Sequence, residues 1–249
     1  MAEPRLFVSL KEWPTCLRLR GSQHHYLAHV LRLSPGAPVV ILDGQGSQAA
    51  ARVQQVRFDE TELSIEKPTP VVQHTPRIVL LCALLKGEKP DFVVQKATEL
   101  GSSEIQFFCC ERSVPKLADG RGEKKQQRWT SIATHAAQQC GRGDVPTIHD
   151  VRPLVSALAV AQGQRLLFFE GLAPHLAQHF QRQGVPCTAT VLVGPEGGLA
   201  PTELLQAEQA GFCKVSLGPL ILRAETAVVA ALATVGFAQQ SRGTDDQTL

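Results

Sequence analysis

Residues 192–198 read Leu192-Val193-Gly194-Pro195-Glu196-Gly197-Gly198, and a second stretch follows with Ser216-Leu217-Gly218-Pro219 and Arg223-Ala224-Glu225-Thr226-Ala227. In each stretch an apolar run typical of a strand ends in a turn that contains glycine, and a predicted helix follows. Two such crossings at one end of an α/β sheet are a common place for small ligands. The sequence therefore predicts a ligand site between these two loops.

Common nucleotide and hydrolase motifs are absent from the sequence. The first loop does not fit G-x-G-x-x-G, and no G-x-x-x-x-G-K-[ST] phosphate loop occurs, so a dinucleotide or a nucleoside triphosphate is disfavoured. No G-x-S-x-G or H-E-x-x-H occurs either. For one glycine loop alone, an ordinary tight turn and a ligand site remain equal alternatives. The second loop favours the ligand site, because both loops follow strand ends.

Strands and helices alternate from residue 77 onward, which is typical of a mostly parallel sheet. The run at 78–85 is apolar throughout, as expected of a strand that is buried on both faces. Glycine after the last turn and proline in the first turn mark where the predicted helices end and begin. We predict strands over 78–85, 105–109, 165–169, 188–193 and 213–217, and helices over 90–100, 123–139, 175–183, 201–210 and 224–238.

The first seventy residues differ in texture, because short strands are broken by turns. Asp43-Gly44-Gln45-Gly46 is a hairpin signal, and one helical interruption is predicted over 23–33. This pattern predicts a small β-barrel. Three prolines within 67–76 indicate a linker. We therefore expect one domain over residues 1–72, a second over 73–240, and a flexible polar tail over 241–249.

Composition excludes several classes of protein. With 43% hydrophobic residues, 19% charged residues and a formal charge of +2, the chain is neither disordered nor uniformly basic. Seven cysteines occur without a C-x-x-C pair, so we interpret them as buried apolar residues in a reducing compartment. No signal peptide or membrane-spanning run is visible, and we expect a soluble, cytoplasmic protein that binds no membrane.

Basic residues gather in two stretches. Residues 112–142 carry seven basic against two acidic side chains, and residues 1–40 carry five against two. A solvated helix face explains one such stretch, but two in different domains favour a polyanion such as RNA. Aromatic residues make up only 5%, which disfavours a stacking sheet of the RRM kind. His24 and His25 lack a carboxylate or cysteine at ligand spacing, so RNA contact or simple exposure is favoured over a metal.

Arg223 stands out at the predicted start of the last helix. A cation there is disfavoured by the helix dipole, so Arg223 calls for a functional reason. Glu225 and Thr226 have an ordinary explanation as an acidic and a hydroxyl residue in a first turn.

Taken together, the motifs resemble the RsmE family of 16S rRNA uracil-N3 methyltransferases, within the SPOUT superfamily. The resemblance covers nearly the whole chain, and its most specific part is the pair of stretches Gly194 to Gly198 and Leu222 to Ala227. This chain departs from the family pattern in an insert-like loop at 118–123 and in the polar tail after residue 240, and neither departure touches a motif. The matching stretches also include Arg5-Leu6-Phe7, Val30-Leu31-Arg32-Leu33, Lys86-Gly87-Glu88-Lys89, Gln95-Lys96-Ala97-Thr98-Glu99-Leu100-Gly101, Glu111-Arg112-Ser113-Val114 and Gln139-Cys140-Gly141-Arg142.

The resemblance implies a fold that periodicity does not predict. It implies an N-terminal PUA-like barrel that binds RNA, and a C-terminal SPOUT α/β domain whose chain forms a trefoil knot. It also implies a homodimer and S-adenosylmethionine (SAM) as the only cofactor, with no metal. The implied cofactor-binding residues are Phe169, Glu170, Gly194, Pro195, Glu196, Gly197, Gly198, Leu217, Gly218, Ile221, Leu222, Arg223, Thr226 and Ala227.

The implied activity is methylation of N3 of a specific uridine in the decoding region of 16S rRNA, on the small ribosomal subunit. Arg223, or else Arg112 or Arg142 from nearby loops, would stabilise the uracil anion, and Glu196 or Glu225 would accept the proton. The expected RNA contacts are Arg5, His25, Arg32, Lys86, Arg112 and Arg142. Two alternatives remain: an RNA-binding assembly factor without catalysis, and a methyltransferase that acts on another RNA uridine.

Overall fold

The structure is a computed structural model that describes residues 3–71, 77–112 and 122–245, with backbone alone at 243–245. It divides into two compact units. The first comprises Met1–His74 together with Ala137–Val145, and the second comprises Thr75–Ala136 together with Pro146–Leu249. Nothing in the sequence indicated that a segment from beyond residue 136 would pack with the first unit.

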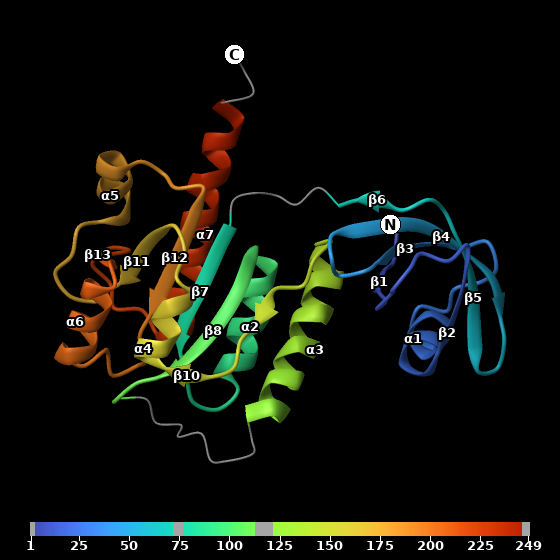
Figure 1. Cartoon of the computed structure of the whole chain (residues 1–249), viewed down its shortest axis with the longest axis horizontal. Helices are drawn as coiled ribbons and strands as arrows, with labels where there is room; N and C mark the ends of the chain where they lie inside the picture. Colours follow the sequence, from blue (N-terminus) through green and yellow to red (C-terminus); the bar gives the residue numbers. More distant parts are fainter. Residues whose placement is uncertain (1–2, 72–76, 113–121, 246–249) are drawn as a thin grey trace. The chain divides into compact units, whose positions relative to one another are not determined.

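The first unit is a curled sheet (Figure 1). Its order is β1-β3-β4-β5-β2, with β6 paired to β4. Among the described residues, the two end strands β1 and β2 are not paired with each other, so the predicted barrel is open. Its helical interruption is an α-turn, α1 (Gly21–His25), followed by a π-turn (Tyr26–Val30). The strands are β1 (Arg5–Phe7), β2 (Cys16–Arg20), β3 (Pro38–Leu42), β4 (Ser47–Val56), β5 (Glu60–Ile65) and β6 (Thr69–Pro70).

Hydrogen bonds fix one turn and one loop of this unit. The Asp43 carboxylate accepts hydrogen bonds from the backbone of Gln45 and Ser47, at 2.7 and 2.9 Å, which closes the predicted hairpin. Nη1 of Arg5 in β1 donates to the carbonyl of Gly141 at 2.8 Å. The segment 137–145 is thereby fixed to the first strand.

The second unit contains a parallel sheet, as the alternation of strands and helices predicted. Its order is β10-β8-β7-β12-β11-β13, with β9 paired to β8. The apolar run of β7 lies at the centre and is buried on both faces. The strands are β7 (Arg77–Ala83), β8 (Ser102–Cys109), β9 (Thr147–Ile148), β10 (Arg152–Pro153), β11 (Gln164–Phe168), β12 (Thr188–Val193) and β13 (Cys213–Val215).

Helices cover both faces of this sheet. Leu154, Leu158 and Ala207, from α4, the turn after it and α6, pack on the face that carries Val79 and Leu81. Helices α2 and α7 contact the sheet and each other (Figure 1). The helices are α2 (Lys89–Glu99), α3 (Gly122–Cys140), α4 (Leu154–Ala157) with a 3-10 turn at Leu158–Val160, α5 (Leu176–Gln183), α6 (Pro201–Gln209) and α7 (Ala224–Asp245). The path of the chain through a knot stays a prediction.

Two sequence predictions need correction. Helix α7 continues to Asp245, so the predicted flexible tail begins too early; residues 246–249 lie outside the described part. The cysteines were interpreted as buried apolar residues, but of the seven only Cys82 is buried, whereas Cys16, Cys140, Cys187 and Cys213 are exposed. An apolar run buries its cysteine only where the strand is covered on both faces, as β7 is. None of the described helices is long and apolar enough to cross a bilayer.

Glu104 is a buried carboxylate near the amino ends of strands β7 and β8, and it allows a test of stability. Glu104 is 8% exposed. Its carboxylate pairs with Arg77, lies 2.7 Å from Nε2 of His149, and accepts from Gln162 at 3.2 Å. Burial raises the pKa of Glu104, but the hydrogen bonds from His149 and Arg77 outweigh it and hold the pKa below its usual value. Its ionised form therefore stabilises the folded chain.

We expect Glu104→Gln to lower the free energy of unfolding by about 1–3 kcal/mol at neutral pH, the usual range for hydrogen bonds to a charged group. Because the folded pKa is lowered, this stabilisation is complete above the usual carboxyl pKa and is lost as the pH falls through the folded value. Urea unfolding across the acidic range should thus show a flatter pH dependence for the variant. Glu99→Gln, which breaks a surface pair with Lys96, is the control. Equal stability of the Glu104 variant and wild type would contradict this interpretation.

Candidate functional site

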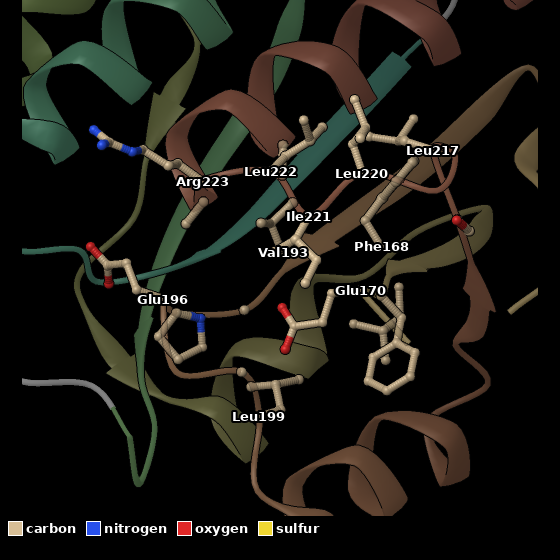
Figure 2. Close-up of a pocket in the computed structure, with 18 of the residues that line it drawn as sticks. Phe168, Glu170, Val193, Glu196, Leu199, Leu217, Leu220, Ile221, Leu222 and Arg223 are labelled. Atoms are coloured by element: carbon tan, nitrogen blue, oxygen red, sulfur yellow. The ribbon is translucent and has the colours of Figure 1, made fainter. Parts of the chain in front are cut away.

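A cavity of about 450 Å³ opens where strands β11, β12 and β13 end (Figure 2). The carboxyl ends of parallel strands meet at the same edge of a sheet, so the loops that follow them converge there. The lining comes from the end of β11, the end of β12 and the loop after it, the loop after β13, the first turns of α6 and α7, and one residue after β8. It consists of Arg112, Leu167, Phe168, Phe169, Glu170, Val193, Gly194, Pro195, Glu196, Gly198, Leu199, Leu204, Ser216, Leu217, Gly218, Leu220, Ile221, Leu222, Arg223, Ala224 and Ala227.

The structure brings nearly all predicted cofactor residues to this one cavity. The exceptions are Gly197, whose carbonyl accepts from Arg112, and Thr226, which is exposed on the first turn of α7. Their role in binding a cofactor stays a prediction. Sequence reasoning missed a further set of lining residues, all of them apolar except Ser216, because an apolar residue of the core and one of a pocket have the same sequence pattern. The residues missed are Leu167, Phe168, Val193, Leu199, Leu204, Ser216, Leu220 and Ala224.

Gly198 needs to be a glycine. Its φ is +70°, and a Cβ there would lie 2.9 Å from Oε1 of Glu170. Glu170 points into the cavity from the end of β11 (Figure 2). Any larger residue at 198 would therefore displace the carboxylate that enters the cavity.

One wall of the cavity is apolar and open to solvent. Leu220 and Ile221 are 78% and 80% exposed, and Leu217 and Leu222 lie on the same loop (Figure 2). Water contact with such a wall is unfavourable, so a flat apolar ring bound against it would be stabilised. This part of the cavity suits a nucleobase.

The other end of the cavity carries the charged residues Glu196 and Arg223, and Lys89, which does not itself line the cavity, pairs with Glu196 there. Nζ of Lys89 lies 2.8 Å from Oε1 of Glu196 and 3.1 Å from Oε2 of Glu225. Glu196 comes from the loop after β12, Glu225 from the first turn of α7, and Lys89 from the first turn of α2. Oε2 of Glu225 is buried and makes no hydrogen bond, so the ammonium group at 3.1 Å compensates its charge.

This ion pair sets the protonation of the site. Burial raises the pKa of Glu196, but the hydrogen bond from Lys89 and the positive charge of Lys86 hold it below the usual value. The hydrogen bond to Glu196 and the negative charge of Glu225 raise the pKa of Lys89. Lys89 is therefore a cation at neutral pH, and Glu196 is an ionised and weakly basic carboxylate. Of the predicted catalytic residues, Glu196 and Glu225 thus share one counter-ion that the sequence analysis did not assign.

Arg223 lines the cavity at the same charged end, beside Glu196 (Figure 2). It is exposed, and within the described part of the chain its side chain makes no hydrogen bond or ion pair. Among the described residues, no side chain that pairs with Arg223 explains why a cation stands at the start of α7, where the helix dipole disfavours it. The guanidinium group is available to a ligand.

The expected RNA contacts fall into two groups. His25, Arg32 and Lys86 are exposed, and so is Arg112, whose Nη1 donates to the Gly197 carbonyl at 3.0 Å. Arg5 is bonded to Gly141, and the Arg142 side chain is only 14% exposed and pairs with Asp144 at 2.9 Å. For Arg5 and Arg142 this geometry favours a structural role, and an RNA role for any of the six stays a prediction.

The histidine pair of the sequence analysis lies in α1 of the first unit. His24 is buried, with Nδ1 2.8 Å from the Thr61 hydroxyl. Across residues 3–71, 77–112 and 122–245, no group of three or more metal-ligating side chains is close enough to hold an ion.

Comparisons with known proteins agree with one another. Residues 73–236 match the family model of an RNA methyltransferase domain. The chain is 30% identical over 242 residues to the ribosomal RNA small subunit methyltransferase E of Bacillus subtilis, covering 92% of each chain. It is 32% identical to the protein of that name from Synechocystis, over 90% of this chain and 73% of the other.

Two solved structures share the architecture. One is a methyltransferase from Legionella pneumophila in complex with SAM, with a TM-score of 0.85 and 27% identity over 96% of this chain and 98% of the other. The second is a ribosomal RNA small subunit methyltransferase E from Neisseria gonorrhoeae bound to SAM. Its TM-score is 0.84 and its identity 29%, over 95% of this chain and 98% of the other.

Proposed function

This chain belongs to the RNA methyltransferase family, and within it to the ribosomal RNA small subunit methyltransferase E family, and we propose that it methylates N3 of one uridine in the decoding region of 16S rRNA. It is a SAM-dependent enzyme that acts on the RNA of the small ribosomal subunit. The observation that carries the proposal is the cavity itself, in which an apolar wall and a charged end with an unengaged arginine lie side by side.

The residues of the cavity fit SAM. Its volume and exposed apolar wall suit an adenine ring, and Gly198 leaves the room that a Cβ would fill. We propose that the loops at 194–198 and 217–223 and the end of β11 at Phe169 and Glu170 hold the cofactor. When bound, SAM supplies an electrophilic methyl group on a sulfonium.

The charged end explains how uridine becomes a nucleophile. N3 lies on the Watson–Crick edge, so the base must be unpaired before it can enter. Loss of the N3 proton places negative charge on the ring nitrogen and on the carbonyl oxygens beside it. Arg223 lies where it can donate hydrogen bonds to such an anion, and a fixed cation stabilises charge that develops in the transition state. Alignment of N3 by the cavity supplies the remaining part of catalysis.

The proton acceptor is assigned to the same end of the cavity. Glu196 and Glu225 are the carboxylates beside Arg223, and both contact Lys89. Their shared lysine lowers the basicity of Glu196, so proton removal depends on stabilisation of the anion by Arg223 more than on a strong base.

We also propose that the enzyme is a cytoplasmic homodimer. Away from the cavity, Phe92 on α2 and Phe237 on α7 are exposed apolar side chains of the second unit, 42% and 72% exposed. Apolar residues of this size on one unit support a protein contact.

The test of the activity uses purified protein, SAM with a labelled methyl group, and small-subunit rRNA. Nuclease digestion followed by mass spectrometry should find the label in 3-methyluridine at one position. Label at another atom or in another RNA would assign the enzyme a different uridine. Absence of SAM binding by calorimetry would instead favour an RNA-binding assembly factor without catalysis.

A further inference from the structure

Glu203 is a buried carboxylate that does not line the cavity. It lies in the first turn of α6 and is 9% exposed. Oε2 accepts a hydrogen bond from the backbone N–H of Ala200 at 2.8 Å, and Oε1 accepts one from the backbone N–H of Glu111 at 2.7 Å. Both oxygens are thus satisfied by the main chain.

The two donors belong to two separate walls of the cavity. Ala200 ends the loop that begins with Gly194, and Glu111 directly precedes Arg112. Arg112 lines the cavity and donates to the carbonyl of Gly197 in that same loop at 3.0 Å. The segment after β8 is therefore joined to the loop after β12 at two points, one made by Glu203 and one by Arg112.

A helix cap alone would need only one of these bonds. The bond to Ala200 satisfies a free N–H group at the start of α6, which is the ordinary task of an acidic residue in a first turn. The bond to Glu111 reaches 92 residues back along the chain and satisfies no group of α6. Its effect is to fix the position of Arg112.

We propose that Glu203 is a positioning residue that holds the Glu111–Arg112 segment against the cavity loop and thereby sets the affinity for SAM. This inference rests on the proposed function. Glu203 touches no ligand itself. It acts through Arg112 and through the backbone of the loop at 194–200.

Glu203→Gln is the direct test, because the amide keeps the length of the side chain but replaces one acceptor with a donor that faces a backbone N–H. We expect the Kd for SAM, measured by calorimetry, to rise about tenfold, as for loss of a hydrogen bond to a charged group. In turnover assays the KM for SAM should rise while kcat at saturating SAM stays near wild type. Glu208→Gln, on the exposed side of the same helix, is the matched control and should bind SAM like wild type.

A purely structural cap would give a different result, namely a lower unfolding temperature with an unchanged Kd, and this would overturn the proposal. A double-mutant cycle with Arg112→Ala tests the route of the effect. If Glu203 acts through Arg112, the double variant binds no more weakly than the weaker single variant. Fully additive losses would overturn that route.

Two further outcomes are decisive. If Glu203→Gln does not fold, Arg112→Ala, which leaves the α6 cap intact, takes its place, and wild-type affinity in that variant overturns the proposal. If the wild-type protein itself does not bind SAM, the proposed function fails and this inference with it. Wild-type binding together with unchanged binding in Glu203→Gln refutes this inference alone.

Discussion

Arg223→Ala is expected to reduce kcat/KM for methylation of small-subunit rRNA by about 10²–10³, the cost typical of removing one group that stabilises a transition-state anion. Arg223 lines the charged end of the cavity, and its side chain makes no hydrogen bond or ion pair with the described residues. Its loss therefore removes no contact of the fold, and a cation at the start of α7 opposes the helix dipole. We expect the unfolding temperature to be unchanged or slightly raised.

The measurement is transfer of labelled methyl groups from SAM, beside thermal unfolding of the same preparation. Arg182→Ala, which removes an exposed arginine from α5, is the control for charge and should retain activity. Arg223→Lys should recover part of the activity, because the charge is kept while the planar fork of donors is lost. Near-wild-type turnover of Arg223→Ala would refute the assignment of Arg223 as the anion-stabilising group.

Arg223 was predicted from a local feature, its position at the start of a helix. Lys89 was missed because its role depends on contacts between segments that are distant in the sequence. A cation in a first helical turn conflicts with the helix dipole wherever the helix lies in the fold. The same argument applies to Lys89 in the first turn of α2, but its answer is tertiary, since its two partners lie more than one hundred residues away in the sequence. No pattern within a window of residues reveals that Glu196 and Glu225 meet at one ammonium group.

The fold shows the same division between local and tertiary information. The parallel sheet followed from strands that alternate with helices, and the apolar run of β7 correctly predicted a strand buried on both faces. The extent of α7 did not follow, because Ser241 and Arg242 have polar side chains that a helix tolerates once its preceding turns are packed. The packing of 137–145 with the first unit depends on contacts such as Arg5 to Gly141, which no periodicity encodes.

Lys89→Met is expected to reduce methylation at neutral pH about tenfold to a hundredfold, because two carboxylates at the charged end then lose their shared counter-ion. Burial raises the pKa of Glu196, and in the wild-type protein Lys89 outweighs that effect. Without Lys89 the pKa of Glu196 should rise. Glu196 is then protonated in a mildly acidic range in which the wild-type carboxylate is ionised.

The pH dependence of kcat separates this explanation from a simple loss of packing. The acidic limb of the Lys89→Met profile should move to higher pH, because activity falls as Glu196 takes up its proton. Lys96→Met is the matched control: Lys96 lies on the same helix, pairs with Glu99 alone among the residues that the structure describes, and its loss should keep activity within about twofold of wild type. An unchanged pH profile in Lys89→Met would show that the ionisation of Glu196 does not govern the reaction. Arg223 would then be the group at this end of the cavity on which deprotonation of uridine depends.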